Sequence, residues 1–400
     1  MVSLEKSRSL LGFDFPHNFI VKIMKKMNTI LQTLSVLISL HLLIACTGNG
    51  VYTVVNDGLP ASDSTLLVKK DTVISINIGS RIDPLSIQTQ MLSDKGDTRY
   101  LIGDENQINI FDINNDTLLN RIPMENAGKI NNYSGFSYIN TDSILVYDYA
   151  KKILSLINTD GKVTKMISLH DRMSGLSPEA LSISPILYSD NKVIMSGIPI
   201  SSKTTLEKSD HISVMIDMQN GEVKTGAYFP DEYRKGYFGG VYYNTISHCI
   251  DNQDRIVYSF PASNYIYRYD TNLNFIDSLY MGSRYTKSIP AIEGSLKEIL
   301  GSKENRESYF AKNHSYGKII FNPYDSVYHR IAAHPSDSFP KPFSIITLSM
   351  EGKHLSETPI LAESNSLISC NAFISPLGLL IQQKTPDENE IHFVIYEIKH

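Results

Sequence analysis

One pattern recurs along most of this chain: a β-branched or aromatic run, a tight turn of Asp, Asn and Gly, and a second such run. Asp, Asn and Gly tolerate the left-handed backbone that hairpin turns require, and β-branched and aromatic residues favour strands. Each copy of the pattern therefore predicts a β-hairpin. The five copies are INIFDINNDTLLNRIPM (108–124), LSLINTDGKVTKMISL (154–169), VMIDMQNGEVKTGAYF (214–229), YRYDTNLNFIDSLYM (267–281) and IITLSMEGKHLSETPI (345–360).

A second pair of predicted strands precedes each hairpin, so a unit holds four strands in roughly 45–60 residues, which is the spacing of propeller blades. The C-terminal unit, 367–398, has only three strands. The strand DTVISINIG (71–79) has no partner of its own, so we expect it to complete the last sheet and leave no free edge. The sequence thus predicts an all-β, six-bladed β-propeller. The only room for a seventh blade is 282–313, where AIEGSLKEIL (291–300) is typical of a helix instead.

The N-terminal part carries an export pattern. Lys25 and Lys26 precede a mainly apolar stretch, 30–44, which is too short and too polar for a membrane span of about 20 residues but has the size of a signal-peptide core. The stretch leads into Leu-Ile-Ala-Cys, which resembles the lipobox of bacterial lipoproteins. That resemblance implies that Cys46 is lipidated and becomes the first residue of the mature protein. The alternative is a free thiol at the end of an ordinary anchor helix.

Segment boundaries and location follow from this pattern. The first acidic residue after Cys46 is Asp57, so the chain lacks both the acidic surface-export signal and the inner-membrane retention Asp of known lipoproteins. We therefore expect a lipid-anchored protein of the outer membrane that faces the periplasm. We interpret the segments as a mis-assigned start (1–23), a lipoprotein signal peptide (24–45), a tether or linker (46–70) and the propeller (71–400).

The chain as a whole resembles the TolB-like six-bladed propellers, and more closely a lipoprotein family known as domain of unknown function number 4221. The resemblance rests on the lipobox followed by DTVISINIG, on the run YLIGDENQINIFDI, and on the late run YGKIIFNPYDSVYHRIA. These features span most of the mature chain but are patterns rather than chemical signatures. The resemblance therefore implies a fold and a location, and it implies no activity.

Composition narrows the partners and the cysteine chemistry. The net charge of −5 and a pI near 6.1 provide no basic footprint, so we expect no nucleic-acid partner. Apart from Cys46, the chain has two cysteines, Cys249 and Cys370. An oxidising periplasm would permit a disulfide, but their predicted strands lie two blades apart, too far for disulfide geometry. We therefore favour two buried thiols.

The sequence contains little evidence for a catalytic or metal centre, and we predict no catalytic residue, no metal and no cofactor. The Asp/Asn-rich turns lack the ligand order of a calcium loop. His329 and His334 lie close in sequence but without helix-borne ligand spacing. A Ser-His-Asp catalytic triad assembled from distant loops is an alternative that the sequence leaves open. Calcium lactonases of the propeller type carry metal-binding acids on their inner strands, whereas the inner strands predicted here have no Asp or Glu: SIQTQM, GFSYI, SPILYS, TISHCI, GKIIF and LISCNAFI.

Long loops collect on one predicted face of the propeller. Among them, EYRKGYFGGVYY in the loop 230–244 is the densest aromatic and cationic run, and Tyr and Arg are typical interface anchors. The alternative is that these aromatics pack over the blade tops. For His170, Arg172, Arg284 and Tyr285 we favour an ordinary role as polar loop residues. The predicted ligand-binding residues are Tyr233, Arg234, Tyr237, Phe238, Tyr242 and Tyr243.

Two functions fit this reading. The first is a non-catalytic binding or scaffold module, tethered to the membrane through Cys46, whose ligand is a protein, peptide or glycan. The second is a periplasmic propeller hydrolase or lyase that acts on carbohydrate or lactone. An enzyme should bring acids or histidines together at the channel mouth, so the acid-free inner strands favour the binding module.

Overall fold

The computed structural model describes eight stretches of the chain, all within one compact unit, residues 52–400. Cys46, the predicted signal peptide and most of the predicted tether lie outside the described residues, as does 294–301, which holds most of the segment expected to be helical. The described stretches are 66–94, 96–125, 127–130, 133–199, 211–293, 302–337, 340–360 and 367–399.

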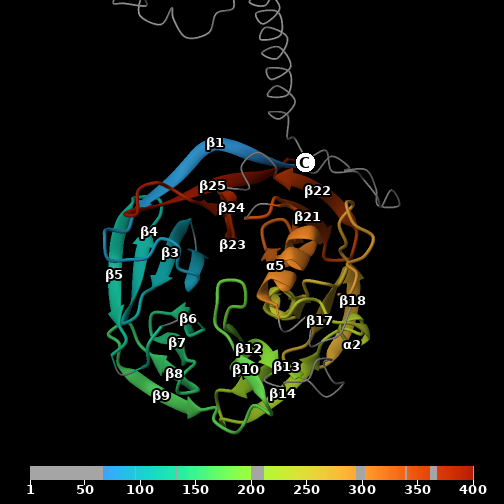
Figure 1. Cartoon of the computed structure of the whole chain (residues 1–400). Helices are drawn as coiled ribbons and strands as arrows, with labels where there is room; N and C mark the ends of the chain where they lie inside the picture. The colour runs from blue at the N-terminus through green and yellow to red at the C-terminus, as the bar shows by residue number, and fades with distance from the viewer. Residues whose placement is uncertain are drawn as a thin grey trace, which may run out of the picture. The chain divides into compact units, whose positions relative to one another are not determined.

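Six antiparallel sheets follow one another around a ring, which confirms the predicted six-bladed propeller (Figure 1). In blades 1, 2, 4 and 5 the first strand lies nearest the ring centre and the later strands lie progressively outward, whereas in blade 6 β23 is innermost and β1 is outermost. Blade 1 contains β2 (Thr89–Asp94), β3 (Asp97–Gly103), β4 (Gln107–Asp112) and β5 (Thr117–Pro123). Blade 2 contains β6 (Gly135–Asn140), β7 (Ser143–Asp148), β8 (Ile153–Ile157) and β9 (Val163–Ser168). Blade 3 contains β10 (Leu176–Pro178), β11 (Leu187–Ser189), β12 (Lys192–Pro199), β13 (His211–Asp217) and β14 (Val223–Tyr228).

The remaining three sheets repeat this plan. Blade 4 contains β15 (Ser247–Ile250), β16 (Ile256–Ser259), β17 (Tyr265–Tyr269) and β18 (Phe275–Tyr280). Blade 5 contains β19 (Ser315–Asn322), β20 (Val327–Ala333), β21 (Phe343–Ser349) and β22 (His354–Ile360). Blade 6 contains β23 (Leu367–Ser375), β24 (Gly378–Gln383), β25 (Glu390–Lys399) and β1 (Leu66–Asn77).

Blade 6 combines the two ends of the described chain. β1 pairs antiparallel with β25, from Leu67 opposite Ile398 to Ile76 opposite Ile391. The strand begins at Leu66, inside the segment expected to be a linker, and includes most of the segment 71–79. This pairing gives blade 6 its fourth strand, so β25 has a partner on both sides.

Burial explains why the middle strands read as continuous apolar runs. Ile144, Leu145, Val146 and Tyr147 of β7 are all at most 1% exposed, because the neighbouring blades cover both faces of the sheet. The outer strand β5, by contrast, is exposed at six of its seven positions. The core therefore lies between adjacent blades, and the polar turns lie at their ends.

The Asp and Asn residues of the hairpins act as turn residues, as the sequence predicted. Asp112 accepts a hydrogen bond from the backbone N–H of Asn114 at 2.8 Å, and Asp217 and Asp270 make the equivalent contact two residues on. Such Asx turns stabilise the chain reversal locally.

Three short helices occur in the described connections: α2 (Glu232–Lys235), α3 (Val241–Asn244) and α5 (Lys303–Lys312). α5 begins after Ser302, whose hydroxyl accepts a hydrogen bond from the Asn305 N–H. In the described part of the chain no helix combines the length and the apolar character needed to cross a bilayer.

Candidate functional site

The two ends of the ring differ in their loops. In blades 1, 2, 4 and 5, short turns join the first strand to the second and the third to the fourth. Short turns also join β11 to β12, β13 to β14 and β23 to β24, and we call the end of the ring that carries all these turns the short-turn face. The connections between blades, which include α2, α3 and α5, emerge at the other end, which we call the long-loop face. The predicted segregation of long loops on one face is thus present.

A pocket of about 360 Å³ lies in the centre of the ring, and we call it the channel pocket. Its mouth is on the short-turn face, because Tyr324 in the β19–β20 turn lines it and is 52% exposed. The volume falls within the usual range for small-ligand sites. The lining residues are Thr89, Gln90, Met91, Ser93, Ser182, Pro185, Ile186, Leu187, His248, Cys249, Ile250, Lys318, Ile319, Ile320, Phe321, Pro323, Tyr324, Ala372, Phe373 and Ile374.

The connection from β10 to β11, residues 179–186, closes the channel toward the long-loop face, and we call it the plug segment. Although it belongs to blade 3, its Ser182 N–H donates to Ile87 O before blade 1 at 2.7 Å. The Ser247 hydroxyl of blade 4 donates to Ile183 O at 2.8 Å. Because the segment contacts blades on several sides, it lies across the centre of the ring, and its Ser182, Pro185 and Ile186 line the floor of the pocket.

Blade 6 holds the plug through a distortion of its inner strand. Ile368 and Ala372 of β23 pair with consecutive residues of β24, so the three residues between them bulge out of the ladder. Within this bulge, Asn371 Oδ1 lies 2.8 Å and Cys370 O 3.1 Å from the Ser182 hydroxyl. Bulges re-aim backbone and side chains and are enriched beside functional sites.

A second bulge aims Lys318 at the floor of the pocket. In β19, Gly317 and Lys318 together oppose the single residue Ile331 of β20. Lys318 Nζ donates to Cys370 O at 3.0 Å and lies 4.5 Å from the centre of the Phe373 ring. The carbonyl of Cys370 is therefore shared between the plug and the lysine.

Lys318 is the one Lys, Arg, Asp or Glu among the described residues that line the pocket. Its side chain is 7% exposed, and burial lowers the pKa of its ammonium to about 7 because the charged form loses hydration. Cys249 and Cys370 are free thiols close to this amine, and burial raises the pKa of both. The floor therefore combines one titrating amine with two neutral thiols.

His248 also faces the floor, but both of its ring nitrogens have partners. Nε2 lies 2.6 Å from Pro185 O, and Nδ1 lies 3.4 Å from the Ser184 hydroxyl. Burial lowers its pKa to about 4, so the ring is neutral near pH 7, with Nε2–H as the donor to the carbonyl. The arrangement fixes the plug segment and leaves the imidazole no free nitrogen for proton transfer.

The walls of the pocket are mainly apolar, and the described lining contains no carboxylate. Across the described residues, no group of three or more His, Cys, Asp and Glu side chains is placed to hold a metal ion. Glu179, at the start of the plug, does not line the pocket; burial raises its pKa to about 7. This geometry suits the binding of a ligand with an apolar body.

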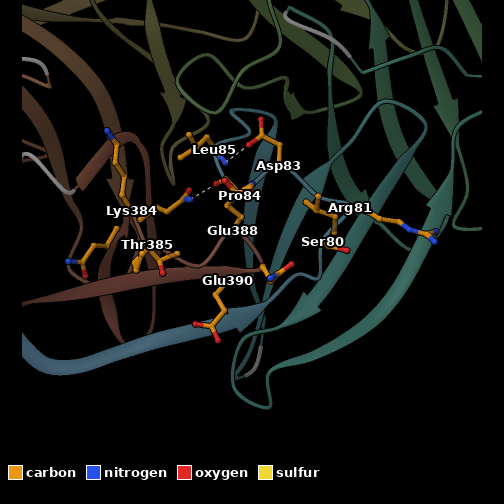
Figure 2. Close-up of a pocket in the computed structure, with 14 residues that line it drawn as sticks. Ser80, Arg81, Asp83, Pro84, Leu85, Lys384, Thr385, Glu388 and Glu390 are labelled. Carbon is orange, nitrogen blue, oxygen red and sulfur yellow. Dashed lines mark hydrogen bonds between the residues drawn. The ribbon is translucent and has the colours of Figure 1, made fainter.

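A larger groove of about 750 Å³ lies between the β1–β2 and β24–β25 loops (Figure 2). It carries acids, but Asp83 accepts from the Leu85 N–H at 2.9 Å, and Glu390 lies 2.7 Å from His392 Nε2. Gln382 donates to Pro84 O at 2.6 Å across the groove, which joins blade 6 to the loop after β1. Because most of its lining side chains are exposed, we regard the groove as a surface feature of the ring junction.

Three of the six predicted ligand-binding residues lie in the core. Tyr233, Phe238 and Tyr243 are 2%, 6% and 0% exposed and pack against blade 4. The Tyr233 hydroxyl donates to Tyr243 O at 2.7 Å, and the Tyr243 hydroxyl donates to His314 O at 2.7 Å. This placement is the one expected if the aromatics pack over the blade tops.

The other three predicted residues are half-buried. Arg234 forms an ion pair with Asp231 at 2.7 Å, and the Tyr242 ring stacks on Phe310 with ring centres 4.8 Å apart. Tyr237 lies in the same loop. A ligand-binding role for Arg234, Tyr237 and Tyr242 stays a prediction, as does the lipidation of Cys46, which lies outside the described residues.

The residues we set aside as ordinary loop residues have local partners. His170 Nδ1 lies 2.7 Å from Asp171, and Arg172 donates to Gly221 O at 2.7 Å. The Arg284 N–H donates to the buried Glu357 at 2.6 Å, and the ring centre of Tyr285 lies 5.2 Å from that of His334. None of these four lines the channel pocket.

Sequence reasoning missed Lys318, Ser182 and the Cys370 carbonyl. One signal was available: Lys318 interrupts GKIIF, whose other residues are apolar or Gly and which was already predicted to face the channel. A charged residue inside such a strand needs a local partner or a ligand.

Solved structures of other proteins resemble the fold of this chain. A DUF4221 family member from Bacteroides vulgatus has 21% sequence identity and a TM-score of 0.72, over 85% of this chain and 99% of that chain. A protein from Bacteroides fragilis described as exported has 13% identity and a TM-score of 0.50, over 87% and 98% of the two chains. A virginiamycin B lyase from Staphylococcus aureus, at 11% identity over 81% and 99%, reaches a TM-score of 0.40, too low to transfer an activity.

Sequence comparison identifies the family directly. No curated protein sequence matches the chain. The family model described as domain of unknown function (DUF4221) matches residues 63–358, which include most of the ring from β1 to β22. This chain therefore belongs to the DUF4221 family, as its sequence patterns predicted.

Proposed function

We propose that this protein is a lipid-anchored binding module whose propeller holds its ligand in the channel pocket. Cys46 provides the anchor, in the outer membrane and facing the periplasm, as the lipobox pattern and the absence of an acid between Cys46 and Asp57 suggest. The partner is the exposed end of a protein, peptide or glycan, or a free small molecule of similar size. Nucleic acid is a poor candidate because the chain has a net charge of −5.

The observation that carries this proposal is the construction of the channel pocket. Inner strands of several blades form its walls, and the plug segment, bonded to three other blades, closes its floor. A pre-formed, mostly apolar cavity with a few convergent polar groups is the usual form of a small-ligand site. A volume of about 360 Å³ accommodates one terminal group rather than an extended chain.

The alternative is a periplasmic hydrolase or lyase acting on carbohydrate or lactone. General acid–base catalysis needs a group that can exchange a proton with the substrate. His248 has both ring nitrogens engaged, and the described lining contains no carboxylate. Lys318 could exchange a proton near neutral pH, but the described lining holds no carboxylate and no free imidazole that could act with it, so we favour binding over catalysis.

Ligand screening with a blocked pocket tests the binding role. The detergent-solubilised lipoprotein would be screened by thermal shift and calorimetry against peptides, glycan fragments and small organic molecules. Ile374→Trp fills the cavity from its wall, and Leu377→Trp adds the same bulk at an exposed turn outside it. Binding to the wild type and to Leu377→Trp but not to Ile374→Trp supports the proposal. A ligand unaffected by Ile374→Trp, or one converted into product, overturns it.

Metabolic labelling tests the anchor. A fatty-acid analogue should label the wild-type protein and should not label Cys46→Ser, because the thioether forms on that thiol. Equal labelling of the two proteins would contradict lipidation at Cys46.

A further inference from the structure

The floor of the channel pocket contains a buried amine with few partners. Within the described residues, Lys318 Nζ makes one hydrogen bond, to Cys370 O, and one ring contact, to Phe373. An ammonium has three donors, so two of them have no acceptor among the residues that the structure describes. A buried charge without an anionic partner is costly unless it is neutralised or bound by a ligand.

The position of the Lys318 amine depends on two specific distortions of the sheets, the bulges in β19 and β23. A regular ladder would place Lys318 opposite one residue of β20; instead Gly317 and Lys318 share Ile331. The bulge in β23 supplies the carbonyl that orients the amine. Both distortions occur in inner strands and converge on the same atom, Lys318 Nζ.

We propose that the channel pocket binds a small organic carboxylate with an apolar body, its carboxylate on Lys318 Nζ at the floor and its body along the walls toward the mouth. This inference rests on the proposed function, because it assumes that the channel is the binding site. It adds the chemical class of the ligand and the orientation in which it enters.

The choice of a carboxylate follows from the single cation and the apolar walls. One ammonium with two open donors matches one monoanionic carboxylate, whereas a phosphate dianion would carry more negative charge than the single cation of the described lining can balance. A second amine would be repelled by Lys318. The cavity of about 360 Å³ equals roughly a dozen water volumes, which sets the ligand at about a dozen non-hydrogen atoms.

Three probes with the same phenylbutyl skeleton and different end groups separate the contribution of ligand charge from that of ligand shape. Phenylbutyrate, phenylbutanol and phenylbutylamine each have about a dozen non-hydrogen atoms, and their binding to the solubilised lipoprotein would be measured by calorimetry against empty micelles. We expect the acid to bind at least about tenfold more tightly than the alcohol, because a hydrogen bond to a charged group adds that much. The amine should bind most weakly.

Variants then assign the preference to one side chain. Lys318→Met should weaken phenylbutyrate about 10- to 100-fold and leave phenylbutanol unchanged, while Lys318→Arg should retain most of the preference. Lys353→Met removes an exposed lysine from a turn on the same face and should change nothing. Ile374→Trp should abolish binding of every probe that enters the pocket.

The pH profile provides an independent readout. Above about pH 7 the free amine loses its proton, so affinity for the acid should fall about tenfold per pH unit, while affinity for the alcohol stays constant. The titratable groups that face the amine are Cys249, Cys370 and His248, and between pH 7 and 8 these remain neutral because burial shifts their pKa values away from this range.

The outcomes separate the two proposals. If alcohol and acid bind equally and both are lost in Ile374→Trp, the binding module stands and the carboxylate inference is wrong. If Lys318→Met binds the acid as tightly as the wild type, the inference is also wrong. If none of the three probes binds, but Ile374→Trp abolishes the binding of some other ligand, the carboxylate inference is wrong and the binding module stands. If Ile374→Trp affects the binding of no ligand, both proposals are wrong.

Discussion

Two buried lysines, one in the channel and one under the long loops, have similar surroundings and opposite consequences. Lys318 and Lys341 are 7% and 6% exposed, and burial lowers the pKa of each to about 7. Lys341 donates to Phe310 O and Asn313 O near the C-terminus of α5 and lies over the Phe310 ring. Lys318 has one carbonyl and an adjoining cavity.

The two lysines differ in which groups accept the hydrogen bonds of their ammonium groups. Carbonyls at a helix C-terminus carry partial negative charge and stabilise a cation, so the protein itself satisfies Lys341. At Lys318 the protein leaves donors facing a pocket. A buried polar group therefore indicates a site when its unused hydrogen-bonding capacity faces a cavity, and burial or a shifted pKa alone does not distinguish the two cases.

The same contrast separates the aromatic loop from the channel. The Tyr233 and Tyr243 hydroxyls are bonded to backbone carbonyls, and their rings pack against Phe238. These aromatic residues are close in sequence and are of types common in binding sites, but in the structure they form a small hydrophobic core over blade 4. The residues of the channel floor, by contrast, come from different blades and lie far apart in the sequence.

The largest expected effect is the loss of a core aromatic. Tyr243→Ala should lower the free energy of unfolding by about 3–5 kcal/mol, because it removes a fully buried ring and leaves a cavity. Denaturant unfolding measures this, and Tyr265→Ala, which removes a 40% exposed ring from the same blade, is the control with an expected change within about 0.5 kcal/mol. A Tyr243→Ala protein with wild-type stability would mean that the loop does not pack as described.

The paired lysine variants test the comparison directly. Lys341→Met should destabilise the protein by about 1–3 kcal/mol, since it leaves two buried carbonyls without a donor. Lys318→Met should be neutral or stabilising at pH 7, because an apolar side chain replaces a poorly compensated buried amine. Equal destabilisation by the two substitutions would show that the channel lysine is structural.

The fold was predictable because its signals are local. Hairpin turns such as the one at Asp112, and the β-branched and aromatic runs that flank them, can be recognised from a few adjacent residues. The inner strands could be assigned in advance from their place in each repeat, and the segment 71–79 from its lack of a partner. Each of these inferences needs only neighbouring residues and the rule that sheet edges are covered.

The site was not predictable because its signals are not local. The contact between Lys318 and Cys370 O depends on two bulges, and a bulge has no clear signature within an apolar strand. The contacts of Ser182 cross the ring to residues nearly two hundred positions away. The aromatic loop misled for a related reason: tyrosines serve packing and binding equally well, and sequence density does not separate them.

The pH dependence of stability provides a graded test of both lysines. A base whose pKa is lowered by folding binds fewer protons in the folded state, so stability is lost as pH falls toward 7 and regained as pH rises toward its unfolded value. Between pH 7 and about 8.5 we expect stability to rise by at most about 1.4 kcal/mol per pH unit for each of Lys318 and Lys341. Denaturant midpoints across this range should show a smaller slope in either Met variant and the smallest slope in the double variant, where the shifted pKa of Glu179 still contributes. An unchanged slope in Lys318→Met would mean that the channel amine is hydrated.

The smallest expected effect is at the half-buried residues of the aromatic loop. Arg234 pairs with Asp231 in an ion pair whose acid is mostly exposed, and such pairs contribute about 0–1 kcal/mol. If the channel is the binding site, Arg234→Ala and Tyr237→Ala should each leave the affinity for a channel ligand within about twofold, since removing side chains that do not touch the ligand changes little. Calorimetry per folded molecule measures this, with Ile374→Trp as the variant that does abolish binding. A loss of tenfold or more in either loop variant, with melting unchanged, would reverse the comparison: the long-loop face would then be the binding surface, and the lysine in the channel would need another explanation.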